Sequence, residues 1–228
     1  MLAAYKAAAN GIPPELADAL QDALEIALAN VPEIAGRVVV CPDVSGSMSS
    51  AITGQRGSAS SAVRCIDIAA LVAAALLRKN PQTLVLPFEN EVVKVDLNSR
   101  DSVMSNAQKL AAVGGGGTNC GAPLRQLNRN KAQADLVVFV SDNQSWLDAN
   151  PRGATAMMHE WETFKQRNPK AKLVCVDIQP YANTQAAERR DILNVGGFSD
   201  AVFSVIAAFA ADRLQPEHWV GVIEETVL

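Results

Sequence analysis

Residues 37–48 read RVVVCPDVSGSM, and this stretch decides the fold. Its first part, residues 37–41, is a short apolar run rich in β-branched valine, which is typical of a strand buried on both faces of a parallel sheet. The chain then changes at once to small and polar residues, as expected for a loop that leaves the end of a strand. In open α/β sheets, ligands bind beyond the carboxyl ends of the strands. The stretch therefore predicts both a parallel sheet and the place of a binding site.

Strand and helix patterns alternate along the rest of the chain. A helix is predicted from Pro14 to Val31, because leucines recur there at helical spacing. Further strands are predicted over residues 83–88, 91–96, 136–140 and 172–177, and further helices over about 62–79, 102–112, 122–130, 154–167 and 199–214. Only Glu89 and Asn90 separate residues 83–88 from 91–96, which predicts a hairpin. We therefore predict an α/β fold with a doubly wound, mostly parallel sheet, helices on both faces and one antiparallel edge strand.

Composition sets limits on the class of protein. The chain has 228 residues, of which 49% are hydrophobic and 19% charged, as in a soluble domain with a sizeable core. Its net charge of −4 gives no general electrostatic reason to bind nucleic acid. No signal peptide is evident, and the longest apolar run, residues 66–77, contains Asp67 and is too short to cross a membrane. The four cysteines form no C-x-x-C pair, so we expect reduced thiols and a cytoplasmic location without membrane contact.

Oxygen-bearing side chains gather in three loops of the predicted sheet. Asp43, Ser45 and Ser47 follow the first strand at alternate positions, so their side chains can point to one place. Thr118 follows a run of four glycines, and Asp142 follows the strand over residues 136–140. We expect both carboxylates to face solvent at their strand ends. These five residues predict an all-oxygen site for a divalent cation, with Mg²⁺ favoured and Mn²⁺ or Ca²⁺ still open.

Other kinds of site fit the same loops less well. Zinc is disfavoured because neither His159 nor His218 is near these loops in sequence. A phosphate-binding loop would need G-K-[ST] after the glycines, whereas here the chain continues with Thr118. A phosphatase that uses a nucleophilic aspartate would need a second aspartate at position 45, where this chain has serine. We therefore predict no enzyme activity, and a metal-dependent phosphohydrolase is the weakest alternative.

The three motifs together resemble a known family of domains. The D-x-S-x-S pattern at residues 43–47, the glycine loop with Thr118, and the strand ending in Ser141-Asp142 resemble the metal-ion-dependent adhesion site (MIDAS) of von Willebrand factor A domains. The resemblance runs from about residue 37 to residue 214. It implies that the five oxygen-bearing residues hold the metal directly or through water. It also implies that one metal position stays open for an acidic residue of a protein partner.

A narrower resemblance covers four segments. The segments CPDVSGSMSS, VRCIDIAALVAAALLR, VGGGGTN and SDNQSW resemble the A domain of bacterial Ro (TROVE-module) ribonucleoproteins. In that family a ring of helical repeats binds noncoding Y RNA and the ends of misfolded RNA. The resemblance implies that residues 1–34 end a helical-repeat module, that 35–214 form the A domain and 215–228 a tail, and that the chain is a fragment.

The family resemblance implies a function in RNA quality control. The chain would be a non-catalytic, metal-binding interaction domain, with RNA bound mainly by the missing ring and an exoribonuclease as a candidate partner. The alternative is an A domain of another partner-binding assembly, either chelatase-like or secretion-associated. The sequence before Met1 in the natural protein would separate these two hypotheses.

A few further polar residues lie close to these motifs. Asn143 and Trp146 are candidates for contacts beside the metal, and local turn and packing roles are as good an interpretation. Arg56 is a candidate for contact with RNA or an acidic partner, but a solvated loop charge is the preferred interpretation. Asp67 is expected to pair with Arg64 at the helical i, i+3 spacing.

Overall fold

The computed structural model of the chain describes residues 13–52, 63–142, 156–179, 186 and 189–214. Within these residues, five parallel strands form one sheet in the order β2-β1-β3-β4-β5. From β1 the chain moves to β2 on one side and then crosses to β3 on the other, so the winding direction reverses between β1 and β3. The strands are β1 Val38–Pro42, β2 Leu84–Val85, β3 Leu136–Ser141, β4 Lys172–Asp177 and β5 Ile192–Gly196.

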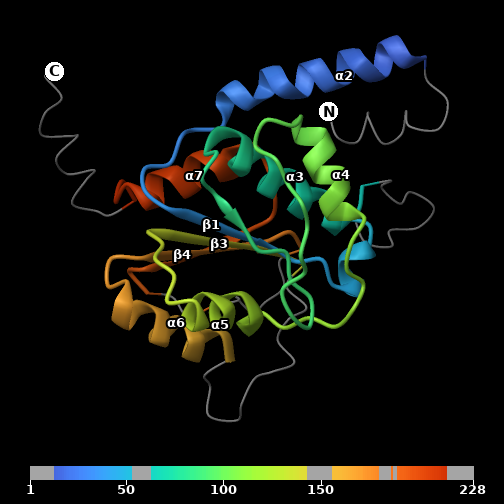
Figure 1. Ribbon diagram of the computed structural model, residues 1–228. Coiled ribbons are helices and arrows are strands. Elements are labelled where there is room, and N and C mark those ends of the chain that lie inside the picture. The colour runs from blue at the N-terminus through green and yellow to red at the C-terminus, as the bar shows by residue number, and fades with distance from the viewer. Residues whose placement is uncertain (1–12, 53–62, 143–155, 180–185, 187–188, 215–228) are drawn as a thin grey trace, which may run out of the picture.

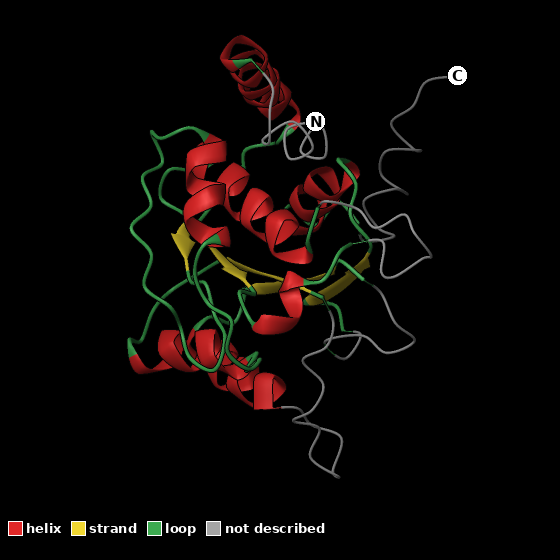
Figure 2. Cartoon of the chain, turned by 90° about the vertical axis from the view of Figure 1, so that its right-hand side faces the viewer, coloured by secondary structure: helices red, strands yellow, loops and turns green. Residues whose placement is uncertain are grey.

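Helices cover both faces of the sheet, as the two ribbon views show (Figures 1 and 2). One face carries α3 (Cys65–Lys79), α4 (Val103–Ala111) and α7 (Ala201–Ala210). The other face carries α5 (Gly121–Arg129) and α6 (Ala156–Arg167). Helix α2 (Pro14–Ala27) lies outside the first layer, and a short 3₁₀ turn, Leu28–Asn30, follows it. The predicted doubly wound α/β architecture is therefore confirmed.

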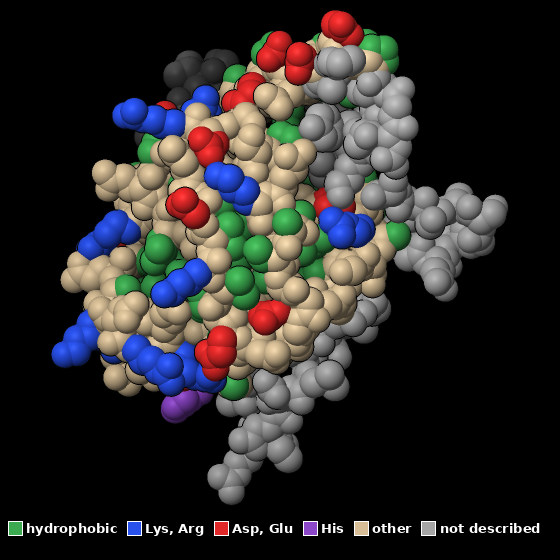
Figure 3. Space-filling model, turned by 45° about the vertical axis from the view of Figure 1, so that its right-hand side comes forward, with side chains coloured by type: hydrophobic (Ala, Val, Ile, Leu, Met, Phe, Trp, Pro, Cys, Tyr) green, Lys and Arg blue, Asp and Glu red, His purple; other side chains and the backbone are tan. Residues whose placement is uncertain are grey.

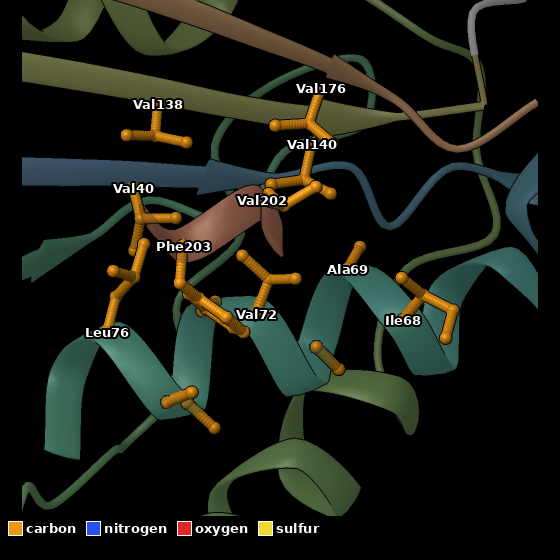
Figure 4. Close-up of a cluster of buried hydrophobic side chains, with 14 of the residues drawn as sticks. Val40, Ile68, Ala69, Val72, Leu76, Val138, Val140, Val176, Val202 and Phe203 are labelled. Carbon is orange, nitrogen blue, oxygen red and sulfur yellow. The ribbon is translucent and has the colours of Figure 1, made fainter. Parts of the chain in front are cut away.

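The apolar runs of the strands are explained by this double cover. On one face, valines of β1, β3 and β4 pack against α3 and α7; Figure 4 shows Val40, Val138, Val140 and Val176 next to Val72, Leu76 and Phe203. On the other face, alternate residues such as Phe139 and Cys175 meet Trp161 and Phe164 of α6. Because both faces are covered, every second residue is no longer free to be polar. Each fully buried valine contributes about 1.5 kcal/mol or more to stability.

The predicted antiparallel edge strand is not seen. Residues 83–88 and 91–96 do approach each other at a turn, but a single antiparallel bridge, Phe88 to Val92, joins them. The next pair of the ladder has only one of its two hydrogen bonds, from the Val93 amide to the Pro87 carbonyl at 2.8 Å. Pro87 has no N–H to return the second bond, so the ladder stops there. The edge of the sheet is the short parallel strand β2 instead.

One strand was not predicted from the sequence, whereas the predicted ion pair between Asp67 and Arg64 is confirmed. Strand β5 pairs in parallel with β4 and closes the far edge of the sheet. Asp67 does pair with Arg64, with 2.9 Å between the carboxylate and the guanidinium. All four cysteine side chains are buried. Among the described helices, none is both long enough and apolar enough to span a membrane.

Candidate metal centre

The three loops predicted to bind a metal meet where the winding of the sheet reverses. Asp43 follows β1 and Asp142 follows β3, and these two strands are neighbours. The register pairs Pro42 with Val140, and the Asp43 amide continues the ladder by donating to the Val140 carbonyl at 2.9 Å. The two aspartates therefore leave adjacent strands at the same edge of the sheet. This is where α/β folds of this kind bind their ligands.

Both aspartates are buried, contrary to the expectation that they face solvent. The exposed fractions of Asp43 and Asp142 are both 0%. The Ser45 amide donates to Oδ1 of Asp43 at 2.8 Å, and the Ser141 hydroxyl donates to Oδ2 at 2.7 Å. The pKa of Asp43 is raised to about 6, mainly by burial and to a smaller degree by the nearby Asp142 carboxylate, while the hydrogen bonds from Ser45 and Ser141 partly offset this rise. The site thus holds two acidic groups close together with little water.

Two serine hydroxyls lie side by side next to these carboxylates. The Oγ atoms of Ser45 and Ser47 are 3.2 Å apart. Ser45 is buried and Ser47 is partly exposed, on the short 3₁₀ turn η2 (Gly46–Ser49). Two neighbouring ligands of an octahedral ion at about 2.1 Å are themselves about 3 Å apart. The spacing of the hydroxyls therefore suits two ligands of one small cation.

The glycine loop packs against the backbone on either side of Ser45. The Gly46 amide donates to the Gly116 carbonyl at 2.8 Å, and the Gly115 amide donates to the Val44 carbonyl at 2.9 Å. Gly114 has a φ of +89°, and a Cβ at this position would lie 2.0 Å from the Val44 carbonyl oxygen. Only glycine allows this approach. Thr118 follows this loop in the chain and is partly buried.

The predicted residues are linked to the site to different degrees. Hydrogen bonds join the segment from Asp43 to Ser47, and the charge of Asp142 acts directly on Asp43. Thr118 is linked through the glycine loop; within the described ranges, no hydrogen bond joins its hydroxyl to either carboxylate. The remaining candidates, Arg56, Asn143 and Trp146, lie outside the described residues.

Three residues near the site were given no role of their own in the sequence-based prediction. Ser141 holds Asp43, and the register of β1 with β3 could have indicated it, because residues 43 and 141 continue the paired strands. Glu89 accepts a hydrogen bond from the glycine loop. Cys65 begins α3; burial raises the pKa of its thiol to about 12, with further contributions from Asp142, Asp43 and Asp67. The thiol therefore stays protonated at neutral pH, which makes it a poor metal ligand.

The donor atoms at the site are all oxygens. In the part of the chain that the structure describes, no group of three or more His, Cys, Asp and Glu side chains could hold a metal. Two carboxylates with two or three hydroxyls form a different kind of site, one that suits hard cations.

Comparison with known proteins identifies the family. Residues 37–210 match the family described as the Ro60 vWA domain. The chain belongs to this family. This Ro60 vWA domain is 29% identical over 198 residues to the RNA-binding protein RO60 of Deinococcus radiodurans, covering 86% of the chain and 36% of that protein. It is 22% identical over 207 residues to the RNA-binding protein RO60 of Caenorhabditis elegans, covering 88% of the chain and 30% of that protein.

A solved structure shows the same architecture. The crystal structure of the Deinococcus radiodurans RO (RSR) protein matches with a TM-score of 0.71 and 27% sequence identity, over 88% of this chain and 39% of that one. The Ro60 vWA domain thus spans about a third of the length of the curated relatives that it matches.

Proposed function

We propose that this domain is a non-catalytic interaction module that binds one divalent cation and uses it to hold an acidic group of a protein partner. The observation that carries the proposal is the meeting of two buried carboxylates with two serine hydroxyls 3.2 Å apart, at the edge of the sheet where the winding reverses.

The burial of the acidic groups supports a cation at this place. Two neighbouring carboxylates that have lost most of their water repel each other, which is why Asp142 raises the pKa of Asp43. A divalent cation would offset this repulsion and favour the ionised form of both groups. The oxygen donors fit Mg²⁺ best, with Mn²⁺ and Ca²⁺ as alternatives.

The contacts suggest how the five residues share this task. Both oxygens of Asp43 already accept a hydrogen bond, so we assign it a role through water. Ser45, Ser47, Thr118 and Asp142 are then the candidates for direct contact. Because hydroxyl ligands are neutral, the cation keeps much of its charge and can attract a carboxylate from a partner at its open position.

We infer the wider role of the protein from what its relatives are named for. Both curated relatives are named RNA-binding proteins, and the matched domain is about a third of each. We infer that Y RNA and misfolded RNA are bound mainly by a helical-repeat ring elsewhere in a protein of this kind, acting in the cytoplasm with an exoribonuclease as partner. On the face shown in Figure 3, Lys and Arg side chains alternate with Asp and Glu, which favours no strong contact between this face and phosphates.

Calorimetry with Mn²⁺ tests the proposal. Asp43→Ala and Asp142→Ala are each expected to abolish binding while circular dichroism shows a retained fold. Asp96→Ala, which removes an exposed carboxylate that belongs to none of the three loops, is the matched control and should bind as the wild type does. Unchanged affinity in both site variants would refute the metal assignment. Hydrolysis of a generic phosphate ester by the Mn²⁺-loaded protein would refute the non-catalytic role.

A further inference from the structure

Glu89 holds the glycine loop through both its side chain and its backbone. It lies in the turn after β2, and its Oε2 accepts a hydrogen bond from the Gly116 amide at 2.7 Å. Its backbone carbonyl accepts a second bond, from the Asn119 amide at 2.9 Å. The Asn119 side chain in turn donates to the Asn90 carbonyl at 3.0 Å. The turn at Glu89 and Asn90 therefore binds both ends of the segment 116–119, which contains Thr118.

The loop has no room to move away from this turn. A Cβ at Gly116 would lie 2.8 Å from Oε2 of Glu89, and a Cβ at Gly117 would lie 2.6 Å from Oδ1 of Asn90. On its other side the same loop meets Val44 and Gly46. The nearest atoms at Gly116 and Gly117 are the ends of the Glu89 and Asn90 side chains, so a larger residue would displace these side chains and disturb the contact between loop and turn.

The Glu89 carboxylate acts as the acceptor of the hydrogen bond from the Gly116 amide. The side chain is partly buried, and within the described ranges no Lys or Arg forms an ion pair with it. By contrast, Glu91 has a side chain that is 71% exposed and lies 3.8 Å from Arg125. A carboxylate bound to a backbone N–H makes a stronger hydrogen bond than a neutral acceptor does. Glu89 is thus suited to fix a backbone, whereas its neighbour lies at the surface.

We propose that Glu89 is a positioning residue of the metal centre, which clamps the glycine loop onto the loop of Asp43 to Ser47 and so presents Thr118 to the ion. Gly116 connects the two, since its amide binds Glu89 and its carbonyl accepts from Gly46, the residue between the two serines. One carboxylate therefore sets the relative position of two of the three motifs without touching the cation. The inference rests on the proposed metal-binding function.

Substitutions at position 89 separate positioning from general stability. Glu89→Ala removes the acceptor, and we expect Mn²⁺ affinity in calorimetry to fall by about 10-fold or more, as for other residues that orient metal ligands. Glu89→Gln keeps a side-chain oxygen at the same reach and should restore affinity to within about 3-fold of the wild type. Glu91→Ala is the matched control and should leave affinity unchanged. Melting temperatures in EDTA report any loss of stability that is independent of the metal.

The outcomes distinguish this inference from the proposed function. If the wild type binds no Mn²⁺, both the proposed metal-binding function and the positioning role of Glu89 are overturned. If the wild type binds Mn²⁺ and Glu89→Ala binds it equally well, only the positioning role is overturned. Where Glu89→Ala does not fold, Glu89→Asp serves instead, because it keeps the charge but withdraws the carboxylate by one methylene. It should then weaken Mn²⁺ binding while the EDTA melting temperature stays near that of Glu91→Ala, and wild-type affinity would overturn the role.

Discussion

Replacing Asp43 with asparagine should make the metal-free protein more stable while removing its response to metal. Asp43 is buried, and its two hydrogen bonds come from the Ser45 amide and the Ser141 hydroxyl. Asparagine has the same shape, can accept the first bond with its oxygen, and can donate to the Ser141 oxygen with its amide. The substitution therefore removes a buried charge without leaving a cavity.

The pKa of Asp43 sets the size of the effect. This pKa is about 6 in the folded protein, against an ordinary value of 3.8 for an aspartate. Since the folded state holds the proton more tightly than the unfolded state, the metal-free wild type loses stability as the pH rises from about 4 to above 6. The full difference of about 2 pKa units corresponds to about 3 kcal/mol at pH 7, and to less than about 1 kcal/mol at pH 4. Asp43→Asn does not titrate and should escape this loss.

Urea unfolding in EDTA at pH 7 and pH 4 measures the difference directly. Asp43→Asn should exceed the wild type by about 2–3 kcal/mol at pH 7, and the gap should nearly close at pH 4. The surface variant Asp96→Asn should show no such gap at either pH. Addition of Mn²⁺ at 100 times its dissociation constant should stabilise the wild type by about 2.7 kcal/mol and the variant not at all. A variant that is less stable than the wild type in EDTA at pH 7, or that still responds to Mn²⁺, would refute the reasoning.

Two further predictions concern the glycine loop and RNA. Gly114→Ala should lower the free energy of unfolding by more than about 2 kcal/mol, because its Cβ would meet the Val44 carbonyl. Gly197 is the control, since it has a similar positive φ of +84° but open space around it. Gly197→Ala should lower the free energy of unfolding by only about 1 kcal/mol. Urea unfolding measures both variants. An equal loss in the free energy of unfolding would show that the close approach of Gly114 to the Val44 carbonyl does not affect stability. Because its net charge is −4, the isolated chain should bind a structured Y-like RNA weakly and without sequence preference, and tight binding at physiological salt in a filter assay would place an RNA site on this domain.

The layers of the fold could be predicted from the sequence, but its two edges could not. Central strands such as β3 are buried on both faces, so their apolar runs stand out from the surrounding sequence. Edge strands lack that signal. Residues 91–96 alternate like a strand, yet Pro87 cannot return the ladder hydrogen bond that would have paired them. Strand β5 is only partly buried, and Asn194 and Gly196 interrupt its apolar pattern.

The residue types of the candidate site could be predicted, while their surroundings could not. The alternation of Asp43, Ser45 and Ser47 is a local pattern, and the structure does bring these side chains together. The burial of Asp43 depends on neighbours that are distant in the chain, such as Ser141, so the expectation of a solvent-facing carboxylate was wrong. The role of Glu89 depends in the same way on contact with a loop 27 residues away.

A crystal structure of this chain grown with Mn²⁺ tests metal binding most directly, because the anomalous signal identifies the ion without ambiguity. We predict one peak in contact with oxygens of Ser45 and Ser47. Asp142 and Thr118 should complete the protein ligands, and Asp43 should be reached through water. One position should hold an exchangeable water, an acetate-like anion or a carboxylate of another molecule. No peak at this edge of the sheet would contradict metal binding, and a shell completed wholly by the chain's own side chains would contradict the role in binding a partner.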